Sequence, residues 1–123
     1  MTALQIPAEI DQSTPEYAEK VAQLNDLFRQ TGRGGKTLTT PGIQDLGPIA
    51  VILLQRAVAT HTTFTDDNDP YGWREFGVIE RPGLPKVFWK IDYYDPQFDR
   101  GSEDPSDPAK TGRVLTILLA SEY

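Results

Sequence analysis

The spacing of apolar residues changes along this chain, and the change restricts the folds open to it. Four apolar side chains recur at helical spacing after residue 13: Tyr17, Val21, Leu24 and Phe28. Residues 86–95 alternate instead, and one face of this predicted strand carries Val87, Trp89, Ile91 and Tyr93. A chain that contains both periods is expected to form an α+β domain, in which helices cover a sheet.

The sequence predicts two helices and about four strands. The first helix begins near Ser13 and Glu16, which have the spacing of a capping box, and it ends at Gly32. The second helix runs from Gly47 to about His61, and because it is apolar nearly all round we expect it to be largely buried. Strands are predicted over residues 36–40, 73–80, 86–95 and 113–120.

These elements have the order α-β-α-β-β-β, which predicts two helices packed on one face of a mainly antiparallel sheet. Residues 113–120 are apolar on both faces, so this strand is expected at the centre of the sheet. Residues 1–12 are expected to form a loosely ordered arm, and residues 13–123 a single domain. Residues 96–112 form a long connection, and connections of this length are usually functional or mobile.

Composition excludes several kinds of site. The 123 residues include no cysteine and one histidine, which excludes disulfides, thiolate metal sites and multi-histidine metal sites. The net charge of -6 argues against direct binding of nucleic acid, because that requires a basic surface. No stretch reaches the ~20 apolar residues that cross a bilayer, and the N-terminal sequence does not resemble a secretory signal. We therefore expect a cytoplasmic protein.

The negative charge is concentrated in the second half of the chain. Residues 1–61 carry 6 acidic and 5 basic side chains, whereas residues 62–123 carry 12 and 7. One interpretation is a solvated surface that keeps the protein soluble. The other is an acidic face that binds a protein with a basic surface. The side chains expected to reach outward on that face are Asp66, Asp67, Glu103, Asp104 and Asp107.

A cleft between the 66–72 loop and the 86–95 strand is the alternative candidate site. Polar and aromatic residues gather in these two segments, as they do in ligand sites. Trp89 or Tyr94 is expected to form a wall of the cleft. The residues predicted to line it are Asp69, Tyr71, Trp89, Lys90, Asp92 and Tyr94.

Two further motifs match their templates only in part. The glycine-rich turn after residue 31 lacks the first P-loop glycine and precedes a strand instead of a helix; only weak anion binding by Arg33 and Lys36 remains. The turn over residues 67–72 begins like a calcium loop, but Val78 stands where the bidentate glutamate belongs. No metal or cofactor is therefore expected, and no catalytic residues are indicated.

Four sequence blocks together resemble one family. They are TGRGG at residues 31–35, NDPYG at 68–72, FWKIDYYD at 88–95 and RVLTILLASEY at 113–123. The chain is similar over residues 18–123 to a bacterial domain of unknown function, found mostly in alphaproteobacteria and often on mobile elements. The resemblance implies a bacterial cytoplasmic protein and supplies no catalytic residues.

Two functional hypotheses follow. The first is a small acidic, non-enzymatic interaction protein, a mobile-element accessory factor that inhibits a host defence nuclease or DNA-binding complex through its acidic face. The physical basis is that grooves built for nucleic acid are lined with Lys and Arg, which an acidic surface can occupy. The second is a small-ligand-binding or enzymatic site in the cleft between the Asp66–Gly72 loop and the Lys86–Asp95 strand.

Overall fold

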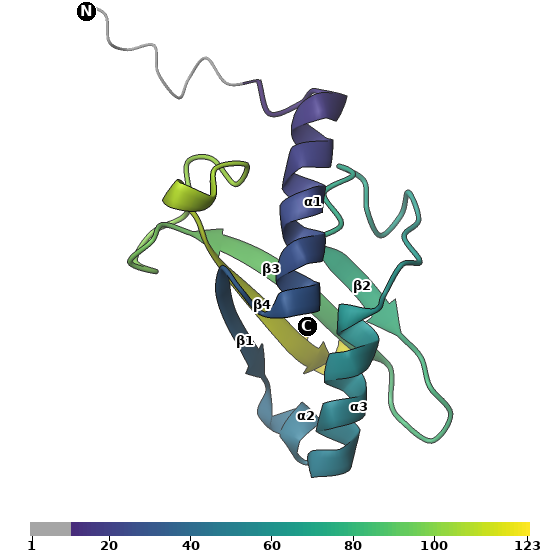
Figure 1. The fold of residues 1–123 in the computed structure, drawn as a ribbon. Helices are drawn as coiled ribbons and strands as arrows, with labels where there is room; N and C mark the ends of the chain where they lie inside the picture. The colour runs from purple at the N-terminus through teal and green to yellow at the C-terminus, as the bar shows by residue number, and fades with distance from the viewer. Residues whose placement is uncertain (1–10) are drawn as a thin grey trace, which may run out of the picture.

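The structure, a computed structural model, describes residues 11–123 and consists of a four-stranded sheet with helices packed on it (Figure 1). The strands lie in the order β1-β4-β3-β2, with β1 parallel to β4 and the other neighbouring pairs antiparallel. Short 3₁₀ turns, η3 (Pro108–Lys110) and η4 (Ala120–Glu122), flank β4. The helices and strands are α1 (Pro15–Thr31), β1 (Gly35–Thr39), α2 (Pro41–Gln44), α3 (Pro48–Ala59), β2 (Phe76–Ile79), β3 (Val87–Tyr94) and β4 (Gly112–Leu119). None of the helices between residues 11 and 123 is both long and apolar enough to cross a membrane.

The α+β class is confirmed, and the sheet is mixed rather than antiparallel throughout. Helices α1 and α3 lie over the same face of the sheet (Figure 1), and both contribute side chains to one hydrophobic core. The parallel pairing of β1 with β4 was not predicted. Strand direction is set by the path of the connections, here α2 and α3, and the alternation of side chains along a strand is the same in either direction.

The ends of α1 are fixed by capping interactions. Thr14 is the N-cap, and its hydroxyl accepts a hydrogen bond from the backbone N–H of Tyr17 at 3.1 Å. The predicted capping box of Ser13 is therefore wrong by one residue; its hydroxyl donates to Asp11 instead. Gly32 ends the helix at φ +75°, a left-handed conformation that a glycine adopts without strain, as predicted.

The core lies between the helices and one face of β3 and β4. Val87, Trp89 and Ile91 point into it, and Lys90 and Asp92 lie on the opposite face, so the predicted alternation of β3 is confirmed. Trp89 requires a glycine on the neighbouring strand β2. A Cβ atom at Gly77 would lie 2.2 Å from the indole nitrogen of Trp89, far closer than van der Waals contact. Strand β4 lies between β1 and β3, which confirms its predicted central position.

The remaining segments are the short helix α2, the long connection after β3 and the N-terminal residues. Pro41 and Gly42 begin α2, whose N-cap is Thr40, because the Thr40 hydroxyl accepts a hydrogen bond from the backbone N–H of Ile43. The long connection after β3 is tied back by a bridge between Tyr94 and Gly101 and contains η3. The predicted N-terminal arm falls mainly on residues 1–10, which lie outside the described residues.

Candidate functional site

Helix α3 exposes apolar side chains to solvent. Its inner face buries Leu54 and Val58, but Ile49, Ile52 and Leu53 are 75%, 60% and 58% exposed. The expectation that this helix is largely buried is therefore wrong. The sheet and α1 cover only one side of it, and no other element of residues 11–123 covers the opposite side. Clustered exposed apolar side chains of this kind mark interaction sites on soluble proteins.

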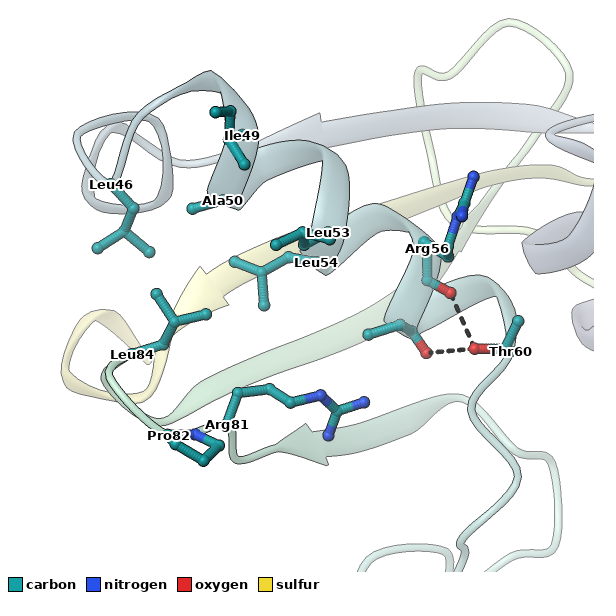
Figure 2. Close-up of a pocket in the computed structure, with 11 residues that line it drawn as sticks. Leu46, Ile49, Ala50, Leu53, Leu54, Arg56, Thr60, Arg81, Pro82 and Leu84 are labelled. Atoms are coloured by element: carbon teal, nitrogen blue, oxygen red, sulfur yellow. Dashed lines mark hydrogen bonds between the residues drawn. The ribbon is translucent and has the colours of Figure 1, made fainter.

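A groove of about 830 Å³ runs between α3 and the Arg81–Leu84 connection that joins β2 to β3. Figure 2 shows Leu46, Leu54 and Leu84 pointing toward one another at one end of this groove. Its wall on the α3 side is formed by small and apolar residues. The lining residues are Leu46, Ile49, Ala50, Leu53, Leu54, Arg56, Ala57, Thr60, Arg81, Pro82 and Leu84. We call this groove, together with exposed Ile52, the α3 surface.

Two arginines stand at the other end of the groove. Arg81 extends along it toward Thr60, and Arg56 leaves α3 on the side away from the Arg81–Leu84 connection (Figure 2). Within residues 11–123 neither guanidinium lies within ion-pair distance of a carboxylate. Arg81 donates to the carbonyl of Glu80 at 3.3 Å, and Glu80 and Lys86 lie beside the groove. The groove thus has an apolar end and a basic end.

A buried arginine on α1 holds the C-terminal end of α3 in place. Arg29 Nη1 donates to the carbonyls of Val58 at 2.6 Å and His61 at 3.1 Å, and its Nη2 pairs with Asp26 at 2.9 Å. The guanidinium also lies 4.9 Å from the ring centroid of Trp89. Burial lowers the pKa of His61, which disfavours the charged form of its imidazole. The α3 surface is therefore attached to a fixed scaffold.

The predicted acidic face is divided by the fold. Asp66 and Asp67 are exposed in the connection between α3 and β2, and Glu103 is exposed in the connection between β3 and β4. The two connections lie on opposite sides of α1 (Figure 1). Asp107 is half-buried and accepts a hydrogen bond from the backbone N–H of Ala109.

Asp104 does not reach outward as expected, because it is only 8% exposed. Its carboxylate accepts hydrogen bonds from the Tyr17 hydroxyl at 2.5 Å and from the Ser106 hydroxyl at 2.7 Å. Burial acts to raise the pKa of Asp104, but these hydrogen bonds outweigh it and hold the pKa below its ordinary value. Burial and the bond to Asp104 raise the pKa of Tyr17 to about 12. Asp104 therefore ties the long connection to α1.

The predicted cleft forms in part. Tyr71, Lys90 and Asp92 line a cavity of about 390 Å³, and Lys90 pairs with Asp92 at 2.6 Å. Trp89 is fully buried on the opposite face of β3, so its expected role as a wall is wrong. Asp69 and Tyr94 do not line this cavity: Asp69 accepts the backbone N–H of Arg74, and the ring of Tyr94 packs near Phe98.

Three residues of this cavity lie outside the two segments that were predicted to form it: Glu75, Phe76 and Tyr123. Glu75 accepts a hydrogen bond from the Tyr93 hydroxyl at 2.8 Å. Burial raises the pKa of Glu75 above its ordinary value, and the nearby carboxylates of Asp69 and Asp92 add to the rise. Glu75 lies in the predicted 73–80 strand, but β2 begins only at Phe76, and the left-handed backbone of Arg74 (φ +52°) interrupts the alternation just before Glu75.

Arg33 and Lys36, the two basic residues of the glycine-rich turn after α1, have different surroundings. Lys36 lies with its ammonium 4.2 Å from the ring centroid of Phe98, which satisfies it by a cation–π contact. Arg33 is exposed, and its backbone N–H donates to the Thr31 hydroxyl. The two side chains therefore have different surroundings, and weak anion binding there stays a prediction.

Comparison with known proteins places the chain in one family. No curated protein and no solved structure matches it. The sequence model of one family, described as a protein of unknown function (DUF3768), matches residues 39–122, which is more than half of the chain and includes both α3 and the Arg81–Leu84 connection. The chain belongs to the DUF3768 family.

Proposed function

We propose that this protein is a non-enzymatic interaction protein that binds a partner protein through the α3 surface. The single observation that carries the proposal is the exposure of Ile49, Ile52 and Leu53 at 75%, 60% and 58% on a helix whose other side packs Leu54 and Val58 into the core. Apolar surface of this kind costs free energy in water, about 25 cal/mol per Å², and a partner that covers it recovers that free energy.

The groove by itself would also suit a small apolar ligand. Ile52, however, lies outside the groove and is 60% exposed, so the apolar surface is wider than the cavity. A molecule confined to the groove would leave Ile52 in water. A protein segment that lies across α3 covers both, which favours a protein partner over a small molecule.

The expected partner with a basic surface would meet a different region. The resemblance to mobile-element proteins supports a host defence nuclease or DNA-binding complex as partner, and the exposed carboxylates of Asp66, Asp67 and Glu103 support contact with its basic groove. Because these carboxylates lie on opposite sides of α1, they support a dispersed electrostatic contribution to association rather than one acidic face.

Site-specific photocrosslinking in the native host tests the proposal. A photoreactive amino acid at position 53 is expected to give a discrete adduct with another protein, and one at exposed Lys20 on α1 is expected to give none. The adduct at position 53 should disappear when Ile49→Glu is added, with the melting temperature unchanged. Equal adducts at both positions, no adduct at position 53, or an adduct only with a second copy of the chain would refute the proposal.

The cleft on the other face of the sheet supports a second candidate, binding of a small ligand. Glu75 is half-buried there, its pKa is raised by burial, and it lies in one cavity with the Lys90–Asp92 ion pair. Calorimetric screening of small polar metabolites against the wild type and Glu75→Gln tests this candidate. Binding that is weakened by Glu75→Gln and unaffected by Leu53→Glu would support it, and no binding in the screen would count against it.

A further inference from the structure

The α3 surface also restricts the chemistry of its partner, and this inference rests on the proposed function above. Its shape comes first. Helix α3 has 12 residues and is therefore about 18 Å long. Ile49, Leu53, Arg56 and Thr60 follow one another at helical spacing and all line the groove. This ridge is apolar at Ile49 and Leu53 and polar at Arg56 and Thr60, and a ridge of mixed character beside a groove matches the arrangement that receives an amphipathic helix.

The charges supply the second restriction. The chain has a net charge of -6, yet the α3 surface carries Arg56 and Arg81, which no carboxylate of residues 11–123 pairs with. Glu80 lies beside the groove, and Lys86 lies there too and offsets it. This surface is therefore positive where most of the protein is negative. Charged groups of a bound partner favour the opposite sign, because unmatched charge at a desolvated rim costs binding free energy.

The distribution of these groups along the groove supplies the third restriction. Leu46, Leu54 and Leu84 meet at one end, Arg81 extends toward Thr60 at the other, and Arg56 projects from the outer side of α3 near that second end (Figure 2). A partner with apolar residues along its whole contact face would leave the guanidinium groups without counter-charges. A partner with acidic residues throughout would leave Leu46 and Leu84 without apolar contacts.

From these three features we infer that the α3 surface binds an amphipathic helix of a partner protein, with apolar residues at helical spacing and acidic residues at one end. The apolar residues occupy the groove beside Leu46, Leu53 and Leu84. At the other end, the carboxylates meet Arg81 within the groove and Arg56 on the outer side of α3. The acidic end also gives the complex its direction, because only one orientation of the helix places those carboxylates at the arginines.

Selection from a displayed library of random 16-residue peptides tests this inference with the intact chain. Each peptide would span about 24 Å as a helix, enough to cover α3. The wild-type chain is the target, and a Leu53→Glu variant, altered at a residue 58% exposed, serves for counter-selection. We expect enrichment of peptides with apolar residues three and four apart and with Asp or Glu at one end.

Charge reversal then tests the role of the arginines. Enriched peptides are expected to bind an Arg56→Glu/Arg81→Glu variant at least about tenfold more weakly, and to bind an Arg33→Glu/Arg100→Glu variant as tightly as the wild type, because Arg33 and Arg100 are exposed away from the groove. Selection against the Arg56→Glu/Arg81→Glu variant should enrich Lys and Arg in place of the acidic residues.

Several results would overturn the inference. They are peptides without helical spacing, basic or uncharged peptides from the wild-type selection, equal binding to both charge-reversal variants, and no enrichment above the Leu53→Glu counter-target. Displacement of selected peptides by a fatty acid with higher affinity would assign the groove to a small amphiphile and overturn it too. If crosslinking at position 53 still identifies a partner protein in any of these cases, the proposed function stands and only the helical, acidic character of the partner is wrong.

Discussion

The α3 surface exposes apolar residues to solvent, whereas the region beneath α1 buries polar residues. On α3, Ile49, Ile52 and Leu53 face water. Beneath α1, Asn25 and Arg113 are 0% and 3% exposed in the interior. Apolar residues outside and polar residues inside reverse the usual distribution, and the two regions tolerate the reversal for different reasons.

The buried polar residues are stabilised within the chain. Arg113 Nε donates to the side-chain oxygen of Asn25 at 2.6 Å, and its Nη2 donates to the carbonyl of Pro105 at 2.6 Å. The amide nitrogen of Asn25 donates to the Tyr93 hydroxyl at 2.8 Å and to the carbonyl of Trp73 at 2.9 Å. Such a network connects α1, β3, β4 and two connections, and no buried side-chain nitrogen or oxygen of Asn25 or Arg113 lacks a hydrogen-bond partner. The exposed residues of α3 have no such partners among residues 11–123. We take this difference to separate residues that specify the fold from residues that serve binding.

A matched pair of neighbouring leucines tests that separation most strongly. Leu54 is 1% exposed and Leu53 is 58% exposed on the same helix. Leu54→Ala should lower the free energy of unfolding by about 2–5 kcal/mol through a cavity in the core, and Leu53→Ala by less than about 0.5 kcal/mol. Urea denaturation of both variants measures this. Similar losses for the two would show that α3 is buried on both sides in solution.

Removal of the central amide tests the network beneath α1. Asn25→Leu leaves Arg113 Nε and the carbonyl of Trp73 without their partners, and we expect a loss of about 3 kcal/mol. Gln23→Leu, at an exposed position of the same helix, is the control and should change stability by less than about 0.5 kcal/mol. A melting temperature of Asn25→Leu equal to that of the control would mean that the network contributes nothing to the fold.

A pair of aspartates separates structural from exposed acidic residues. Asp104→Asn weakens the hydrogen bonds from Tyr17 and Ser106, because a neutral oxygen accepts less strongly than a carboxylate, and should cost about 1–2 kcal/mol. Asp66→Asn, at an exposed loop position, should cost less than about 0.5 kcal/mol. Thermal denaturation compares the stability of the two variants. Equal losses of stability would show that Asp104 is an exposed acidic residue in solution, without a structural role.

The smallest expected effect is a pH dependence at the edge of the network. Burial raises the pKa of folded Glu75 above 4.5, so the folded state favours its protonated form. The resulting stability is complete below pH 4.5 and is lost as the pH rises through the raised pKa. Glu75→Gln should therefore melt at a higher temperature than the wild type near pH 7, with the difference vanishing below pH 4.5. If the difference in melting temperature between the two proteins did not change with pH over this range, Glu75 would be solvent-exposed with an unshifted pKa.

The sequence alone determined the elements whose signals are local. Periodicity, a cap and Gly32 defined α1 to within two residues, and alternation assigned Trp89 and Lys90 to opposite faces of β3. The central place of β4 followed from its apolar character on both faces. These features depend on neighbouring residues along one segment, so a sequence carries them directly.

Only the tertiary structure decided which surfaces are covered and which charges are free. The composition of α3 is that of a buried helix, but burial requires a second packing layer, and none of the described elements supplies one. The sequence predicts Asp104 on the surface. In the structure it is buried and accepts a hydrogen bond from Tyr17, which lies 87 positions away in the chain. Arg81 joins the groove because the β2–β3 connection packs beside α3. Each of these facts depends on contacts between residues distant in the sequence, which patterns within one segment do not encode.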